Sequence, residues 1–176
     1  MTERKNRNMI YAALFAALIT VLTAYFHINT GTNSGYIHFG DSMIYIASCV
    51  LPFPYAAAAA SIGGALADLL SGAPVWSIPT LIIKALNVVP FVFMSLVSEK
   101  RRKIDRIISS PSVIAAVFSG IITSAGYFIA ESIIFSFRVA AVSFWPGLIQ
   151  PVGSILLFYI AGTALDAIKF KSKITG

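Results

Sequence analysis

Apolar residues occur in long runs along this chain, and short polar segments separate the runs. A helix rises 1.5 Å per residue, so about 20 apolar residues cross a hydrocarbon core of roughly 30 Å. By this measure the hydrophobic pattern predicts an all-α membrane protein with six transmembrane helices. The expected spans are residues 9–26, 42–53, 55–71, 78–97, 111–137 and 144–168.

The second expected span is short, and Pro52 and Pro54 end its helical pattern. A re-entrant segment is the alternative, but it would put the basic cluster at residues 100–106 outside the cell. Basic clusters beside membrane helices stay in the cytoplasm. We therefore count residues 42–53 as a thin or tilted span, which places both the N-terminus and the C-terminus in the cytoplasm.

Composition indicates a single membrane domain over residues 1–176. The chain has 57% hydrophobic and 11% charged residues, which is more apolar surface than a soluble domain of this size buries. Its longest polar interruption, at residues 98–110, is too short to form a core. The net charge of +6 comes mainly from short basic clusters beside the apolar runs, without a stripe of basic and aromatic residues. We expect no nucleic-acid partner.

A few polar residues interrupt the apolar segments, where each must be paired, hydrated or bound to a ligand. On the six-helix topology they fall in the outer half of the membrane, and the inner half is nearly free of charge. A pore would need polar residues along its whole length, so we expect an outward-facing pocket that is closed below. These residues are Asp41, Asp68, Lys84, Asn87, Tyr127, Glu131 and Gln150.

Several of these residues also have a purely structural interpretation. Asp41 precedes an apolar run and could cap a helix. Lys84 could extend its ammonium group to the membrane surface, and Glu131 could pair with Arg138. Pairing of Lys84 with Asp68 or Glu131 would instead leave the pocket neutral and suited to an uncharged ligand.

Aromatic residues could complete such a pocket. The polar loop at residues 27–40 contains Tyr36, His38 and Phe39, which suit a cover over it. Tyr36, Tyr127 and Trp145 could stack on a flat ligand.

Catalytic motifs are missing from the sequence. The two histidines, His27 and His38, lie in one loop without a carboxylate or cysteine at metal-ligand spacing. The sequence contains no HExxH, no GxSxG and no glycine-rich phosphate loop. We therefore expect no enzyme activity, no metal site and no cofactor.

Small residues recur at a spacing of four in the first expected helix, as Ala12 and Ala16 and as Ala13 and Ala17. This spacing leaves a flat strip that another helix can approach closely. The strip could pack against this chain's own helices or against a partner subunit.

Three stretches carry a resemblance to a known family. They are Gly-Tyr-Ile-His-Phe-Gly-Asp at residues 35–41, Gly-Ala-Leu-Ala-Asp-Leu-Leu-Ser-Gly at 64–72 and Pro-Thr-Leu-Ile-Ile-Lys-Ala-Leu at 79–86. In this order they resemble the substrate-binding S components of energy-coupling factor (ECF) vitamin transporters, in the branch for riboflavin-like and hydroxymethylpyrimidine-type ligands. The paired alanines are similar to the motif with which the first helix of that family contacts its coupling subunit.

The resemblance implies a six-helix bundle in a bacterial plasma membrane. Such a subunit captures a vitamin or its precursor outside the cell, docks on a transmembrane coupling subunit and reorients while two cytoplasmic ATPases work. The alternatives are a solitary ion-coupled secondary carrier and a structural membrane subunit.

For the ligand, the resemblance implies a small heteroaromatic compound. A hydroxymethylpyrimidine or a pyridoxine-like compound comes first, ahead of riboflavin or a queuosine precursor. Asn87 stands where many relatives have a small residue, so the ligand can differ from that of the branch. The expected substrate-binding residues are Tyr36, His38, Asp41, Asp68, Lys84, Asn87, Tyr127, Glu131, Trp145 and Gln150, and the expected partner interface is Ala12, Ala13, Ala16 and Ala17.

Overall fold

A computed structural model describes residues 2–29, 36–99 and 105–175 of the chain. Its described part is helical except for one short antiparallel ladder, in which His27 pairs with His38 and Asn29 pairs with Tyr36. The elements in chain order are α1 (Thr2–Ala24), β1 (His27–Asn29), β2 (Tyr36–His38), α2 (Asp41–Val50), α3 (Phe53–Leu70), the 3₁₀ turn η1 (Pro74–Trp76), α4 (Ser77–Leu86), α5 (Val89–Glu99), α6 (Ser110–Ile134), α7 (Phe137–Gly147), α8 (Ile149–Ala167) and α9 (Phe170–Thr175).

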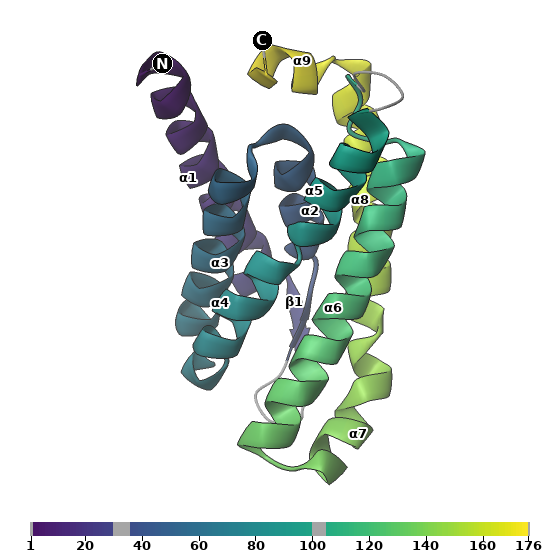
Figure 1. The fold of residues 1–176 in the computed structure, drawn as a ribbon. Coiled ribbons are helices and arrows are strands. Elements are labelled where there is room, and N and C mark those ends of the chain that lie inside the picture. The colour runs from purple at the N-terminus through teal and green to yellow at the C-terminus, as the bar shows by residue number, and fades with distance from the viewer. Residues whose placement is uncertain (1, 30–35, 100–104, 176) are drawn as a thin grey trace.

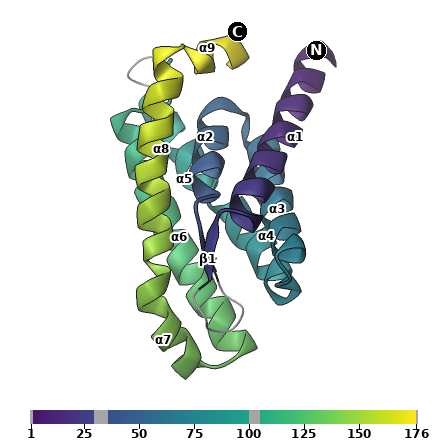
Figure 2. The same cartoon turned by 180° about the vertical axis from the view of Figure 1, so that it is seen from behind.

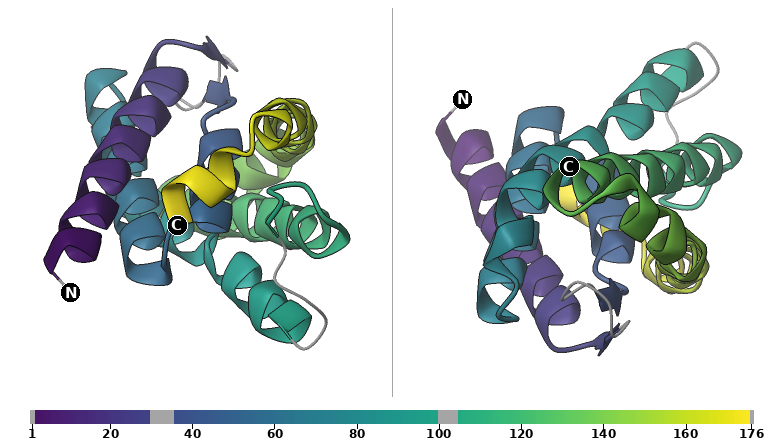
Figure 3. Two further views of the ribbon diagram at one scale, coloured as in Figure 1. Left: turned by 90° about the horizontal axis from the view of Figure 1, so that it is seen from above. Right: turned by 90° about the horizontal axis from the view of Figure 1, so that it is seen from below.

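The helices form two groups with α2 between them. Figures 1 and 2 show α1, α3 and α4 on one side and α6, α7 and α8 on the other. Both termini lie at one end of the bundle, which we call the inner end because it carries the terminal basic residues. From the ladder, α2 runs toward this inner end, where α9 lies across the end of α2 (Figure 3).

The helix pattern confirms the prediction of an all-α membrane protein. Among the described residues, the segments long and apolar enough to cross a membrane are Thr2–Ala24, Phe53–Leu70, Pro74–Val97, Ser110–Ile134 and Phe137–Ala167. The shorter apolar helix α2 occupies the place of the expected second span. The division into six spans within one domain is consistent with these helices and stays a prediction in its exact limits.

The expected fourth span, residues 78–97, falls within the apolar segment Pro74–Val97. Its helix is divided between α4 and α5 just before Pro90, which has no amide hydrogen to continue the helix. Residues 138–143 lie between the expected spans 111–137 and 144–168, where an outer turn would connect them. That expectation is wrong, because the segment is helical within α7. The Ser136 hydroxyl caps this helix by accepting a hydrogen bond from the Val139 amide at 3.3 Å, a signal that the sequence analysis missed.

Small residues let α1 and α3 pack closely. A Cβ atom on Gly63 of α3 would lie 2.7 Å from the Ala16 carbonyl oxygen of α1. The Thr20 hydroxyl of α1 also donates a hydrogen bond to the Gly63 carbonyl at 3.0 Å. Ala12 and Ala16 are partly buried against the core, whereas Ala13 and Ala17 are exposed. The first pair therefore takes part in internal packing and the second pair does not, and the expected partner interface at these four alanines stays a prediction.

Apolar and hydrogen-bonded contacts close the inner end. The rings of Tyr45, Phe91 and Phe158 join α2, α5 and α8, with centroid distances of 5.5 to 6.1 Å. Beyond them, the Asp166 carboxylate of α8 accepts hydrogen bonds from the amides of Ile107 and Ile108 at 2.6 and 2.9 Å. This arrangement ties the start of α6 to the end of α8.

We expect Gly63→Val to destabilise the protein, because its side chain meets a main-chain oxygen that cannot move without separating α1 from α3. Overpacking of this kind costs about 1–3 kcal/mol, so Tm should fall in a thermal melt of the purified protein. The control is Gly147→Val, where a Cβ atom has nothing within 4 Å. Equal Tm values for the two variants would contradict the close packing of α1 on α3.

Candidate functional site

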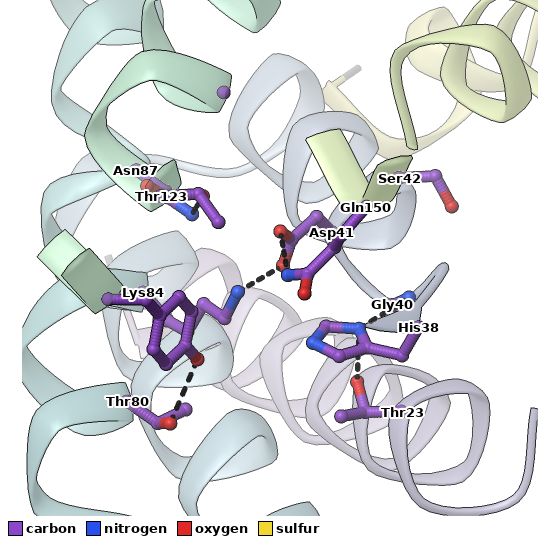
Figure 4. A network of polar contacts seen from close by, with 12 residues as sticks. Thr23, His38, Gly40, Asp41, Ser42, Thr80, Lys84, Asn87, Thr123 and Gln150 are labelled. Carbon is purple, nitrogen blue, oxygen red and sulfur yellow. Dashed lines mark hydrogen bonds and ion pairs between the residues drawn. The ribbon is translucent and has the colours of Figure 1, made fainter. Parts of the chain in front are cut away.

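Asp41 lies at the centre of a buried polar cluster that we call the Asp41 layer. Its side chain is fully buried, and each carboxylate oxygen has a partner from another helix. Oδ1 lies 2.6 Å from the Lys84 ammonium nitrogen of α4, and Oδ2 accepts a hydrogen bond at 3.0 Å from the Gln150 amide of α8 (Figure 4). The Asp41 layer therefore joins the two groups of helices.

The chain before Asp41 explains how a carboxylate reaches this depth. The Gly40 amide donates a hydrogen bond at 3.1 Å to Nδ1 of His38, and the Thr23 hydroxyl lies 3.4 Å from the same nitrogen. A Cβ atom on Gly40 would lie only 2.0 Å from the Thr23 oxygen, so only glycine permits this contact with α1. The helix cap is Gly40 rather than Asp41, and the expected capping role of Asp41 is wrong.

Lys84 is 1% exposed and directs its ammonium group to the interior. It does not extend toward the membrane surface, and the partner that the structure gives it is Asp41. The Lys84 nitrogen also lies 5.1 Å from the centroid of the Tyr127 ring, a cation–π distance. The Tyr127 hydroxyl, in turn, lies 2.9 Å from the Thr80 hydroxyl, and this hydrogen bond holds the ring in position.

Asn87 lies at the division between α4 and α5, and its side chain is fully buried. Its amide and the Thr123 hydroxyl of α6 are 2.8 Å apart. With the amide oxygen turned toward Thr123, the amide nitrogen donates to the carbonyls of Ser119 and Ile83 at 3.2 and 3.3 Å. This orientation satisfies both ends of the amide and holds α4 against α6.

The other expected site residues lie around this layer rather than in it. Asp68 and Glu131 are both buried, and Glu131 accepts a hydrogen bond from the Ser143 hydroxyl of α7 at 2.8 Å. Trp145 is 73% exposed, and its ring contacts Phe144. The backbone of Tyr36 lies in β2, but its side chain is outside the described part of the structure.

Sequence reasoning missed several residues that lie in the layer or next to it. Trp76, which the analysis of the sequence did not count among the site residues, is only 7% exposed, and its ring lies 5.8 Å from that of Tyr127. Thr80 stands one helical turn before Lys84 on the same face, a spacing that could have identified it. The others, Thr23, Thr123 and Ser143, are common residues in apolar helices and give no signal of their own.

The electrostatics of the layer are those of a neutral site. Lys84 and Asp41 cancel each other at 2.6 Å, and Gln150 adds a neutral donor. Removing two charges from water is costly, so a buried pair is tolerated only when further hydrogen bonds satisfy it. Among the described residues, no group of three or more His, Cys, Asp and Glu side chains could hold a metal ion.

These features define a multi-pass membrane protein with a buried polar site between its helices. Comparison with known families then identifies it: residues 4–167 match the family described as ECF-type riboflavin transporter, S component. The chain belongs to that family. It is therefore the substrate-binding subunit of an ECF transporter, in a family that is not enzymatic and works in vitamin uptake.

One curated protein illustrates the similarity outside the family description. It is an "Uncharacterized protein in gap 3'region" from Pyrococcus woesei, 27% identical over 139 residues, which cover 79% of this chain and 88% of that protein. No solved structure matches the chain. S components in general work with a transmembrane coupling subunit and ATPases, whereas the bacterial membrane expected for this chain stays a prediction.

We expect Lys84→Met to lower the free energy of unfolding by about 3–5 kcal/mol, because it leaves the Asp41 carboxylate buried without its countercharge. The double variant Lys84→Met with Asp41→Asn removes both charges and should recover most of this loss. Thermal or denaturant unfolding of the purified protein measures both. A double variant as unstable as the single one would contradict the ion pair as the source of the effect.

Proposed function

We propose that this subunit captures a neutral heteroaromatic vitamin or precursor at the Asp41 layer from the outer side. It then delivers the ligand through the coupling subunit and the ATPases of its transporter. The observation that carries the proposal is the pairing of Lys84 with Asp41. Because Lys84 is already paired with Asp41 at 2.6 Å, an anionic ligand such as a phosphate ester would have to compete with Asp41 for this ammonium group.

The groups around the pair favour a flat ring with polar edges. Tyr127 and Trp76 offer aromatic faces, and aromatic rings prefer offset or edge-on contacts with other rings. Gln150, Thr80 and Asn87 supply hydrogen-bond donors and acceptors close to these faces. A ring nitrogen, an amino group or a hydroxymethyl group can exchange hydrogen bonds with such side chains. The remaining expected contacts, Tyr36, His38, Asp68, Glu131 and Trp145, stay predictions.

Among ligands of this class, we place hydroxymethylpyrimidine and pyridoxine-like compounds first and riboflavin next. Direct contacts at 2.6 and 3.0 Å join α4, α2 and α8 across the layer. A single-ring ligand displaces fewer of these contacts than the three fused rings of riboflavin. The family description supports riboflavin as the alternative, and a queuosine precursor follows it.

Purified protein should bind one of these ligands without ATP or an ion gradient, as measured by isothermal titration. Lys84→Ala should weaken the binding more than tenfold, because it removes the ammonium group and thereby leaves the Asp41 carboxylate without its countercharge. The matched control is Lys173→Ala, an exposed lysine of α9 at the inner end. A phosphorylated form of the ligand should bind more weakly than the neutral form.

Three outcomes would contradict this assignment. Unchanged affinity in Lys84→Ala would reject the site. Uptake into vesicles by this chain alone under a proton or sodium gradient would instead support a solitary secondary carrier. A structural subunit would show no protection against heat by any of these compounds.

We further propose that Ala13 and Ala17, the exposed pair on α1, contact the coupling subunit. Small residues allow close helix approach, so Ala13→Leu with Ala17→Leu should prevent co-purification with that subunit and leave Tm and ligand affinity unchanged. Ala141→Leu, on the exposed face of α7, is the control. Normal co-purification of the double variant would place the interface elsewhere.

A further inference from the structure

A second set of polar groups lies one helical turn from the Asp41 layer. Tyr45 follows Asp41 by four residues on α2, and Ser154 follows Gln150 by four on α8. Residues four apart share a helix face and are separated by about 6 Å along the axis. Since α2 and α8 both run toward the inner end (Figure 1), these two side chains lie on the inner side of the Asp41 layer.

A third helix contributes to the same level. Ser119 precedes Thr123 by four residues on α6, and α6 runs from the inner end outward. Ser119 therefore also lies one turn inward of Thr123, which is beside the Asp41 layer. The Ser119 hydroxyl is near enough to the Tyr45 phenol to act on it as a hydrogen-bonding group, but the two hydroxyls do not reach the distance and angle of an ordinary hydrogen bond. We call Tyr45, Ser119 and Ser154 the hydroxyl layer.

All three side chains are fully buried, at 0% exposure. Within the part of the chain that the structure describes, the hydroxyl oxygens of all three lack a hydrogen-bond partner from the protein. A buried hydroxyl without a partner destabilises a fold, and native proteins nearly always satisfy such groups with protein or with ordered water. The three groups lie at one level of α2, α6 and α8, and α8 packs against both other helices. This arrangement points to a shared partner that is not part of the chain.

We propose that the hydroxyl layer binds a buried water molecule. A buried water typically makes about three hydrogen bonds, and this layer offers three hydroxyl groups that can each donate or accept. The water site thus lies directly inward of the Asp41 layer, so polar groups border that layer on its inner side.

The surroundings favour water over an ion or a larger molecule. The rings of Phe91 and Phe158 lie against Tyr45 at 5.5 and 5.7 Å and limit the layer on its inner side. Hard cations in proteins are usually bound by at least one carboxylate, and both oxygens of Asp41 already have partners in Lys84 and Gln150. A small neutral molecule with both donor and acceptor capacity fits these partners.

The first test is the sign of the change in Tm for Tyr45→Phe in ligand-free protein. If the hydroxyl is bonded to water, its removal should lower Tm by roughly 2–4 °C. If the layer is dry, the same change removes a buried unsatisfied group and should raise Tm. Tyr159→Phe, at an exposed position of α8, is the matched control for loss of a phenol hydroxyl. A rise in Tm specific to Tyr45→Phe would overturn the proposal.

The second test is a double-mutant cycle of Tyr45→Phe and Ser154→Ala. Two hydroxyls that share one water are coupled, so the double variant should lose less stability than the sum of the single variants. Additive losses would overturn the shared site. Ser119→Ala replaces Tyr45→Phe in the same cycle if the phenol variant does not fold.

Ligand-binding measurements distinguish a water site in the hydroxyl layer from the ligand site proposed at the Asp41 layer. If water occupies the hydroxyl layer, Tyr45→Phe should change the affinity for hydroxymethylpyrimidine, pyridoxine or riboflavin by less than twofold. A loss of more than tenfold would assign the layer to the ligand and overturn the water site. Both Tm tests use ligand-free protein, so they decide the water site even if none of these compounds binds.

Discussion

The buried ion pair between Lys84 and Asp41 is the interaction on which the rest of the structure depends. A charge inside an apolar bundle is tolerated only with a partner in good geometry, and these two atoms lie 2.6 Å apart. Gln150 occupies the second carboxylate oxygen, so α2, α4 and α8 are held at one point. Loss of either charge would leave the other without compensation in the interior. The pair therefore constrains both the fold and the chemistry of the site.

Local features of the backbone bring the residues of the buried site into position. The short ladder and Gly40 bring the start of α2 into the bundle, where Asp41 can meet a lysine from another helix. The division of α4 from α5 before Pro90 gives Asn87 its place beside Thr123. Irregular backbone of this kind is tolerated at membrane depth when it is buried in protein and its polar groups are satisfied. The irregular positions are thus the ones that build the site.

The polar groups form a graded series from the outer side inward. The Asp41 layer contains charges that cancel, the hydroxyl layer is neutral, and the rings of Tyr45, Phe91 and Phe158 are apolar except for one phenol. Beyond them the Asp166 carboxylate fastens the loop before α6 to α8. A subunit that captures a ligand on one side and releases it only within a transporter requires such a closed inner side. This gradient agrees with the family to which the chain belongs.

The sequence by itself determined the membrane class, the positions of most helices and the family, because apolar runs and local motifs are properties of neighbouring residues. It also identified the buried charged residues of the described chain, Asp41, Asp68, Lys84 and Glu131, since a charge in an apolar run is conspicuous. Only the tertiary structure decided that Lys84 pairs with Asp41, and that Trp76 rather than Trp145 lies beside Tyr127. These choices depend on the rotation of each helix and on how deeply the ladder places α2. Both result from contacts between residues far apart in the chain, which no local pattern records.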